Sequence, residues 1–355
     1  MVIATRHELQ EDQQLLLDLI QGIGPFDRLS LDELPVVLRA LLAKETLVLD
    51  DWLGYPDMAD TGAMPVDTAL IWSIRKNVVW PKQCMRLLLD LGASSTRRSK
   101  EEKSPLEVLA GRIHPTRNGA EITVACGKML IDAGGLESST LHRHGHTALH
   151  LAAQKQNTGL CQLMLAHGGE EERLALVCAG VGGWDYTGYP QGNTALHFAA
   201  VNGCIELCTL LLDNGADANA TNVHGDTALH FSAIRGRMQL CTLLLNNGAD
   251  ANATGANGDT ILHEAVRSGS LEVCRILLDR GADVLAEYPS GFLPEEMALR
   301  LSHWPIVLMF RAFIAQRQNR LAFAMGHHER LGEHSLVRPL DVEVIRMVLT
   351  AEGGI

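Results

Sequence analysis

Two short motifs recur in phase along the middle of the chain, and their spacing constrains the fold more than any other feature. Gly-Asn-Thr-Ala-Leu-His-Phe-Ala-Ala at residues 192–200 returns as Gly-Asp-Thr-Ala-Leu-His-Phe-Ser-Ala at 225–233 and as Gly-Asp-Thr-Ile-Leu-His-Glu-Ala-Val at 258–266. Thr194, Thr227 and Thr260 therefore lie 33 residues apart. Each such heading is followed by an apolar run that ends in Gly-Ala-Asp. A fixed period of this size is typical of a stacked repeat architecture.

The heading and the Leu-Leu-x-x-Gly-Ala-Asp ending resemble those of the ankyrin repeat, across roughly residues 62–300. The resemblance implies an all-α fold, an ankyrin-repeat solenoid of stacked helix–turn–helix repeats with hairpin fingers and helical N- and C-terminal caps. It also implies that the heading Thr caps the first helix and that the His three residues on hydrogen-bonds to the neighbouring repeat. The predicted repeats span 66–103, 104–144, 145–191, 192–224, 225–257 and 258–290, with a partial repeat at 291–318.

The repeats are flanked by segments of different character. Residues 1–61 carry twelve acidic and four basic side chains, a net charge of −8. An amphipathic helix over 7–21 and a second one after Ser30, with Glu33 at the capping-box position, are predicted there. We interpret this segment as an acidic helical N-terminal cap, with an independent interaction module as the alternative. Residues 319–355 are predicted to be a C-terminal helical tail.

Two repeats are longer than the period. Ser104 and Cys126 are separated by eight more residues than Thr194 and Cys208, which predicts a longer loop at 112–119. Thr147 and Thr194 are 47 residues apart, and the surplus of 14 falls after Gly168, where the family places a finger. Long loops on a regular scaffold are more often functional than idle. The aromatic residues of this insertion, Trp184, Tyr186 and Tyr189, either contact a partner or fold back to cover the gap that the insertion opens in the repeat.

The eight cysteines indicate neither disulfides nor a metal cage. Cys161, Cys208, Cys241 and Cys274 occupy one slot of successive repeats, about 10 Å apart for packed helices, which is beyond the ~7 Å reach of a disulfide. We expect buried thiols and hence a reducing compartment, cytoplasmic or nuclear. The chain shows no signal peptide at its N-terminus and no apolar run long enough for a membrane helix.

Clusters that could carry chemistry are weak. His142, His144, His146 and His150 lie close together, but the heading already employs His150 and no acidic or thiol ligand accompanies them. His327, His328 and His334 are similarly isolated, and Cys178 has no assignable base. We therefore predict no metal, no cofactor and no enzymatic activity.

The overall charge of −12 disfavours nucleic acid, because phosphate binding requires a basic surface. We predict a monomeric, non-catalytic scaffold or adaptor that binds a protein on the concave face formed by fingers and first helices. The resemblance implies contacts at the variable positions of the repeat and in the inserted finger, namely Trp184, Asp185, Tyr186, Tyr189, Val223, His224, Asp226, Ile234, Arg235, Ala256, Asn257, Asp259, Arg267 and Ser268.

The resemblance further implies asparagine β-hydroxylation at Asn219 and Asn252. An alternative function is that of a substrate-recognition subunit of a ubiquitin ligase. In such proteins a short C-terminal box follows the repeats, and residues 336–349 form a Leu- and Pro-bearing segment of suitable place and size.

Overall fold

The computed structural model describes residues 69–75, 81–90, 92–99, 103–112, 117–136, 146–167, 169–181, 191–255, 258–287 and 291–324. The predicted N-terminal cap at 1–61, the box-like segment at 336–349 and the histidines at 327, 328 and 334 lie outside these residues. The chain divides into two compact units, residues 1–202 with 206–216, and residues 203–205 with 217–355. Each unit is described by itself.

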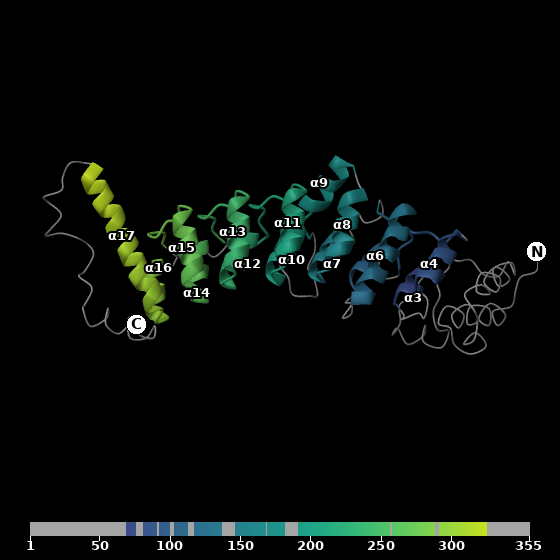
Figure 1. Cartoon of the computed structure of the whole chain (residues 1–355), viewed down its shortest axis with the longest axis horizontal. Helices are drawn as coiled ribbons and strands as arrows, with labels where there is room; N and C mark the ends of the chain where they lie inside the picture. The colour runs from purple at the N-terminus through teal and green to yellow at the C-terminus, as the bar shows by residue number, and fades with distance from the viewer. Residues whose placement is uncertain are drawn as a thin grey trace, which may run out of the picture. The chain divides into compact units, whose positions relative to one another are not determined.

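The first unit is a row of helix pairs in two layers (Figure 1). First helices α3, α5, α7 and α10 contact one another in that order, and second helices α4, α6 and α8 form the other layer. The helices are α3 (Ala69–Arg75), α4 (Pro81–Asp90), α5 (Pro105–Ala110), α6 (Arg117–Asp132), α7 (Ala148–Gln154), α8 (Thr158–His167), α9 (Glu170–Cys178), α10 (Ala195–Asn202) and α11 (Ile205–Asp213).

The second unit repeats the same arrangement. First helices α12, α14 and α16 contact in order, as do second helices α13, α15 and α17. The helices are α12 (Ala228–Ile234), α13 (Met238–Asn246), α14 (Ile261–Ser268), α15 (Leu271–Asp279), α16 (Pro294–Arg300) and α17 (Trp304–Ala324). The structure therefore confirms the paired helices predicted from the 33-residue period.

The core lies between the layers of each unit and is built from small and aliphatic side chains. Leu211, Leu244 and Leu277 of the second helices are fully buried. The alanines that begin the first helices α7, α10 and α12 are buried as well. Cys126, Cys161, Cys208, Cys241 and Cys274 are buried as thiols. Burial raises the pKa of the Cys126 thiol to about 11 and those of Cys241 and Cys274 to about 12. These cysteines therefore act as small apolar core residues, as predicted.

Glycine ends the second helices because the chain turns there through the left-handed region. Gly215, Gly248 and Gly281 have φ of 89°, 84° and 87°. At the first of these, Ala216 N–H donates to Leu211 O at 3.0 Å and thereby satisfies a carbonyl at the helix end. The Gly-Ala-Asp ending of the motif thus has a direct structural cause.

The structure corrects two loop predictions. The insertion after Gly168 does not run as a loop throughout, because residues 170–178 form α9. The first turn of α9 contains Glu170, Glu171 and Glu172. Acidic side chains there stabilise the helix by interacting with the positive end of its dipole. The expected loop at 112–119 is also shorter than predicted, because α6 already begins at Arg117. None of the described helices is long and apolar enough to span a membrane.

Candidate protein-binding surface

The headings place a Thr and a His at the start of each regular first helix. Thr147 N–H donates to Nδ1 of His150 at 3.1 Å, and the same bond is 3.0 Å long at Thr194 and at Thr227. Because Nδ1 accepts a hydrogen bond, the ring is neutral and carries its proton on Nε2. That proton is donated by His150 to Ala179 O at 2.8 Å. The predicted cap is present at Thr147, whose Oγ1 accepts from His150 N–H at 3.4 Å, and the predicted bond to the neighbouring repeat is present at His263, whose Nε2 donates to Phe292 O at 3.1 Å.

Burial keeps these rings uncharged. His150 is fully buried, and its pKa is lowered to about 4 by burial and by the neighbouring His146. Burial also lowers the pKa of His230 and His263. The heading histidines are structural hydrogen-bonding groups, and the His150 ring has both nitrogens engaged by protein atoms.

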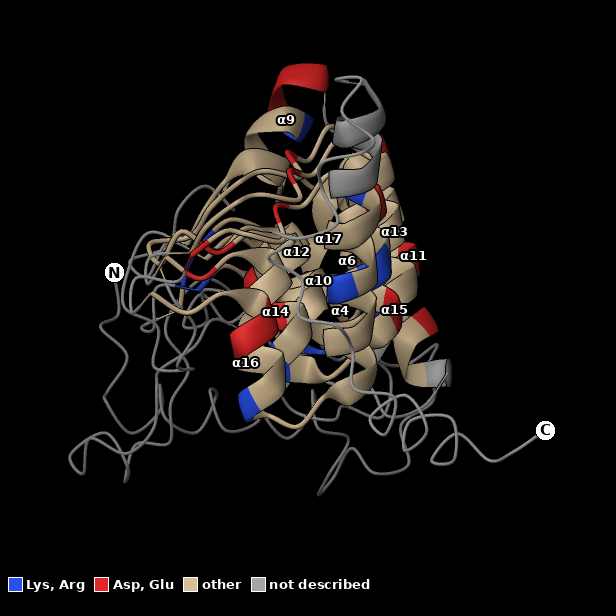
Figure 2. Cartoon of the chain, turned by 90° about the vertical axis from the view of Figure 1, so that its left-hand side faces the viewer, with Lys and Arg blue, Asp and Glu red and all other residues tan. Residues whose placement is uncertain are grey.

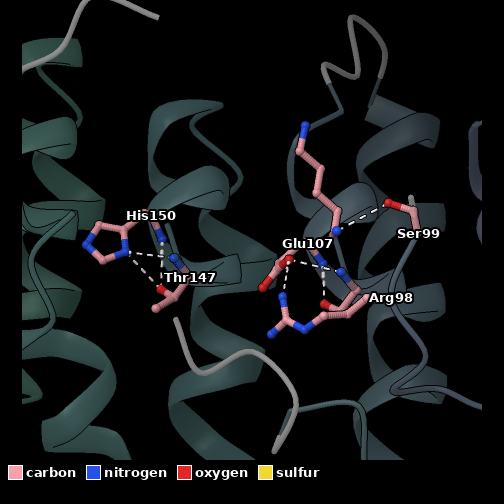
Figure 3. A network of polar contacts seen from close by, with 7 residues as sticks. Arg98, Ser99, Glu107, Thr147 and His150 are labelled. Atoms are coloured by element: carbon pink, nitrogen blue, oxygen red, sulfur yellow. Dashed lines mark hydrogen bonds and ion pairs between the residues drawn. The ribbon is translucent and has the colours of Figure 1, made fainter. Parts of the chain in front are cut away.

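Glu107 takes the place of the heading His in α5. Its carboxylate accepts hydrogen bonds from Ser104 N–H at 2.9 Å and from Arg98 at 3.5 Å, and Figure 3 shows Arg98 directed toward Glu107. The side chain is buried, and burial raises its pKa against the opposing effects of the Ser104 bond and of Arg98. The start of α5 is thus capped by a carboxyl group, where the headings at Thr147, Thr194 and Thr227 use a neutral imidazole.

The predicted contact residues that the structure describes fall on the second unit, in two groups. Val223 and His224 lie exposed in a finger turn, and Asp226 is half-buried at its base. Ile234 and Arg235 end α12 with exposed side chains, while Arg267 and Ser268 end α14. Val223 is 56% exposed and Ile234 42%, which is high for apolar side chains on a packed scaffold. We call this face, formed by the finger turns and the ends of the first helices, the finger-side surface.

Asn222, which sequence reasoning missed, holds the finger turn in shape. Its Oδ1 accepts hydrogen bonds from His224 N–H at 2.9 Å and Asp226 N–H at 3.0 Å. Its own N–H donates to Asp226 O at 3.0 Å, and Gly225 turns the chain with φ 71°. Asparagine is favoured at such turns because its short side chain bonds to nearby backbone groups. The turn thereby presents Val223 and His224 to solvent.

Asp259 is an exception among the predicted contact residues, since it is only 8% exposed. Its Oδ2 lies 3.7 Å from Arg267, which also donates to Glu264 Oε1 at 2.6 Å. Glu264, likewise missed at the sequence level, is 7% exposed. The available signal was the repeat itself, because Phe198 and Phe231 occupy the same position of the two preceding headings.

The predicted modification sites, Asn219 and Asn252, are exposed and connect successive turns. Asn219 Nδ2 donates to Gly248 O at 2.9 Å, and its Oδ1 accepts from Asp250 N–H at 2.7 Å. Asn252 makes the equivalent pair of bonds to Gly281 and Asp283, at 3.0 and 2.8 Å. The two asparagines therefore form a ladder of side-chain bonds along the second unit.

Several predicted positions cannot be placed on this surface. Trp184, Asp185, Tyr186 and Tyr189 lie outside the described residues, as do Ala256, Asn257, His142 and His144. The base of the inserted segment is described. Val181 N–H donates to Asn193 O at 3.0 Å, and Gly192 N–H donates to Val181 O at 2.8 Å. Cys178 is exposed at the end of α9. Among the described residues, no group of three His, Cys, Asp or Glu side chains is placed to hold a metal ion.

Stacked helix pairs with finger turns on one side define the class of helical repeat proteins. The family model of ankyrin repeats, which contains three copies, matches residues 118–222 and 215–288. The chain is an ankyrin-repeat protein with an all-α solenoid fold. The comparison with curated proteins finds no match. Ankyrin repeats are generally protein–protein interaction modules, and the family is typically non-catalytic.

Proposed function

We propose that the protein is a non-catalytic scaffold or adaptor that binds a protein partner on its finger-side surface. The observation that carries the proposal is the exposure of the large apolar side chains Val223 and Ile234 on a surface that also carries the exposed side chains of Arg235 and Arg267. Arginine is enriched in binding hot spots, and the buried centre of an interface is more apolar than its rim. A scaffold held by buried headings and turn glycines can present them without ordering a loop upon binding.

The inserted segment extends this proposal. Its aromatic residues Trp184, Tyr186 and Tyr189 are of the types that dominate interface energetics. Its base is fixed by the backbone bonds between Val181 and residues 192–193, so the two ends of the segment are held together. We include these three residues, with Asp185, in the proposed contact set.

Affinity capture from the native organism tests the proposal, with the full chain and a variant lacking residues 182–190 as baits. The deletion keeps α9 and the described residues at 181 and 191 on either side of the cut. We expect a partner that the full chain captures and the deletion variant captures poorly. Trp184→Ala should weaken capture without lowering the melting temperature. A lower melting temperature with unchanged capture would show that the aromatic residues only cover the scaffold.

Asn219 and Asn252 are proposed sites of β-hydroxylation. Both are exposed at a repeated turn position, and their amide groups already link that turn to the next one. Mass spectrometry of the protein isolated from its native source should show the mass of one added oxygen atom on the peptides that contain these residues. Unmodified peptides in that sample would contradict the proposal.

A further inference from the structure

Three carboxylates and one guanidinium gather on the second unit where α14 meets the finger turns. Arg267 donates to Glu264 at 2.6 Å and lies 3.7 Å from Asp259. Asp226 lies at the edge of the same group, because Gly255 adjoins both Asp226 and the backbone oxygen of Asp259. A Cβ added at Gly255, in the adjoining finger, would lie 2.8 Å from Asp226 Oδ1. The three acidic side chains and Arg267 leave a net charge of −2.

The group contains hydrogen-bonding capacity that the fold does not use. Glu264 Oε2 and Asp259 Oδ1 are buried and have no hydrogen-bond partner among the described residues. Buried carboxylate oxygens without donors are unfavourable, so natural proteins retain few of them. Two such oxygens in one group therefore suggest that the group is kept for a purpose other than the stability of the fold.

The repeat pattern shows that folding does not require Glu264. The two preceding headings have Phe198 and Phe231 at this position, with the same Leu-His before it and a small residue, Ala or Ser, directly after it. Asp226 and Asp259 are also equivalent positions of successive headings, whereas the next repeat has Phe292 there. The acidic group is thus local to one part of the finger-side surface. In Figure 2 acidic residues are visible on the ribbon of the first helices α14 and α16.

The geometry indicates which cation fits. The acidic side chains are not placed as a metal site, since the described residues contain no suitable ligand group. A guanidinium does fit, because Arg267 reaches both Glu264 and Asp259 at once. The Arg267 side chain is 42% exposed and belongs to the last turn of α14, so rotation into solvent requires no change in the helix.

We propose that Asp226, Asp259 and Glu264 form a subsite for a lysine or arginine side chain of the protein partner. Arg267 is the internal cation that the incoming side chain displaces. Rotation of Arg267 uncovers the Glu264 and Asp259 carboxylates, and the partner's cation then donates to Glu264 Oε2 and Asp259 Oδ1, which accept no hydrogen bond from the residues that the structure describes. This inference rests on the proposed function and specifies the partner as one with a basic segment.

Titration of the full chain with a hexa-arginine peptide tests the subsite, with binding followed by calorimetry. Glu264→Gln removes one charge from the group, and Glu272→Gln removes the same charge from an exposed position on α15. We expect the first change to weaken binding by about tenfold, as for loss of a charge-assisted hydrogen bond, and the second by less than about twofold. Equal effects of the two changes would mean general attraction to an acidic protein and would overturn the subsite.

Arg267→Gln gives a prediction of opposite sign. Since the internal competitor is removed, the peptide should bind more tightly than to the unaltered chain, by roughly threefold or more. Weaker binding would show that Arg267 contacts partners directly and would overturn its role as a displaced cation. Glu264→Phe introduces the residue that the two preceding headings have at this position. It should weaken binding of the hexa-arginine peptide as Glu264→Gln does. An unchanged circular dichroism spectrum then shows that the subsite is lost and the fold is not.

Capture of the native partner separates this inference from the proposed function. If the unaltered chain and the Glu264→Gln variant capture the partner equally, the subsite is refuted and the scaffold function stands. If the unaltered chain captures no protein, the scaffold function fails, and the subsite fails with it as a partner-binding site even where the peptide binds.

Discussion

At the scale of single residues, the heading histidines link the stability of the repeats to pH. The folded chain keeps His150 neutral down to about pH 4, because its pKa is lowered by burial, whereas in the unfolded chain the ring takes up a proton below its ordinary value of 6.5. The unfolded state therefore binds more protons between these values, and stability is lost as the pH falls from 6.5 to 4. Each such histidine contributes up to ~1.4 kcal/mol per pH unit.

The variant His150→Gln tests this linkage. Glutamine retains a polar side chain near Thr147 but does not titrate, so the variant should lose less free energy of unfolding between pH 7 and 5 than the unaltered chain. Urea unfolding at a series of pH values measures the difference. Glu107 and Glu264 contribute with the opposite sign, because their raised pKa values make stability fall as the pH rises above 4.5, so the two proteins are compared at each pH. Parallel profiles for both proteins would contradict the account.

Leu244 tests the placement of the core. Its side chain is fully buried on α13, so Leu244→Ala should reduce the free energy of unfolding by ~2–5 kcal/mol through the cavity it leaves. Leu285→Ala serves as the control, because Leu285 is 54% exposed and its loss should cost less than ~0.5 kcal/mol. Urea unfolding followed by circular dichroism measures both. Similar small losses would show that Leu244 is not inside the core.

Residues that recur were predictable, and residues that depart from the repeat were not. Thr147 and His150 could be assigned roles because the same pair returns in later headings, so one physical cause explains all of them. Glu264 carries no such support, since a single departure from Phe gives no hint of the residue it meets. The approach of Arg267 to Asp259 at 3.7 Å joins residues eight positions apart, and the spacing of the motifs does not reveal such a contact.

At the scale of elements, the regular helices follow from the motifs, while α9 and the start of α6 do not. The period gives the position of each helix pair, because every repeat must bury the same faces against its neighbours. An insertion has no counterpart in the other repeats, so the 33-residue period predicts nothing about its structure. The acidic run at 170–172 is a local signal for the start of α9, but no other repeat has a helix at this place, among the residues that the structure describes, that would support the prediction.

The ladder of turns is an element that can be weakened selectively. Asn219→Ala removes two hydrogen bonds between successive turns and should lower the free energy of unfolding by ~1–2 kcal/mol. Asn247→Ala is the matched control, because its side chain donates back to Leu243 O of its own helix, at 2.9 Å. Thermal unfolding of both variants distinguishes them. A control that loses as much as Asn219→Ala would indicate that the bonds between turns contribute nothing specific.

At the scale of the whole molecule, the proposed function depends on a division between a scaffold and a surface. The heading Thr, Leu and His residues and the inward-facing leucines of the second helices recur because they hold the helix pairs together, and they are buried. Val223, Ile234 and Arg235 vary from repeat to repeat and are exposed, so they are free to be selected for a partner. Sequence reasoning reaches this division, but the partner itself is read by shape and charge, for which no transferable code exists.

The most direct test of this account is the dissociation constant for the captured partner, measured with two triple variants. One replaces Val223, Ile234 and Arg235 of the finger-side surface by alanine, and the other replaces the exposed second-helix residues Gln239, Glu272 and Arg275. The account predicts that the finger-side variant binds at least ~tenfold more weakly and that the second-helix variant changes by less than ~twofold. Equal affinity of the finger-side variant and the unaltered chain, or a loss confined to the second-helix variant, would contradict it.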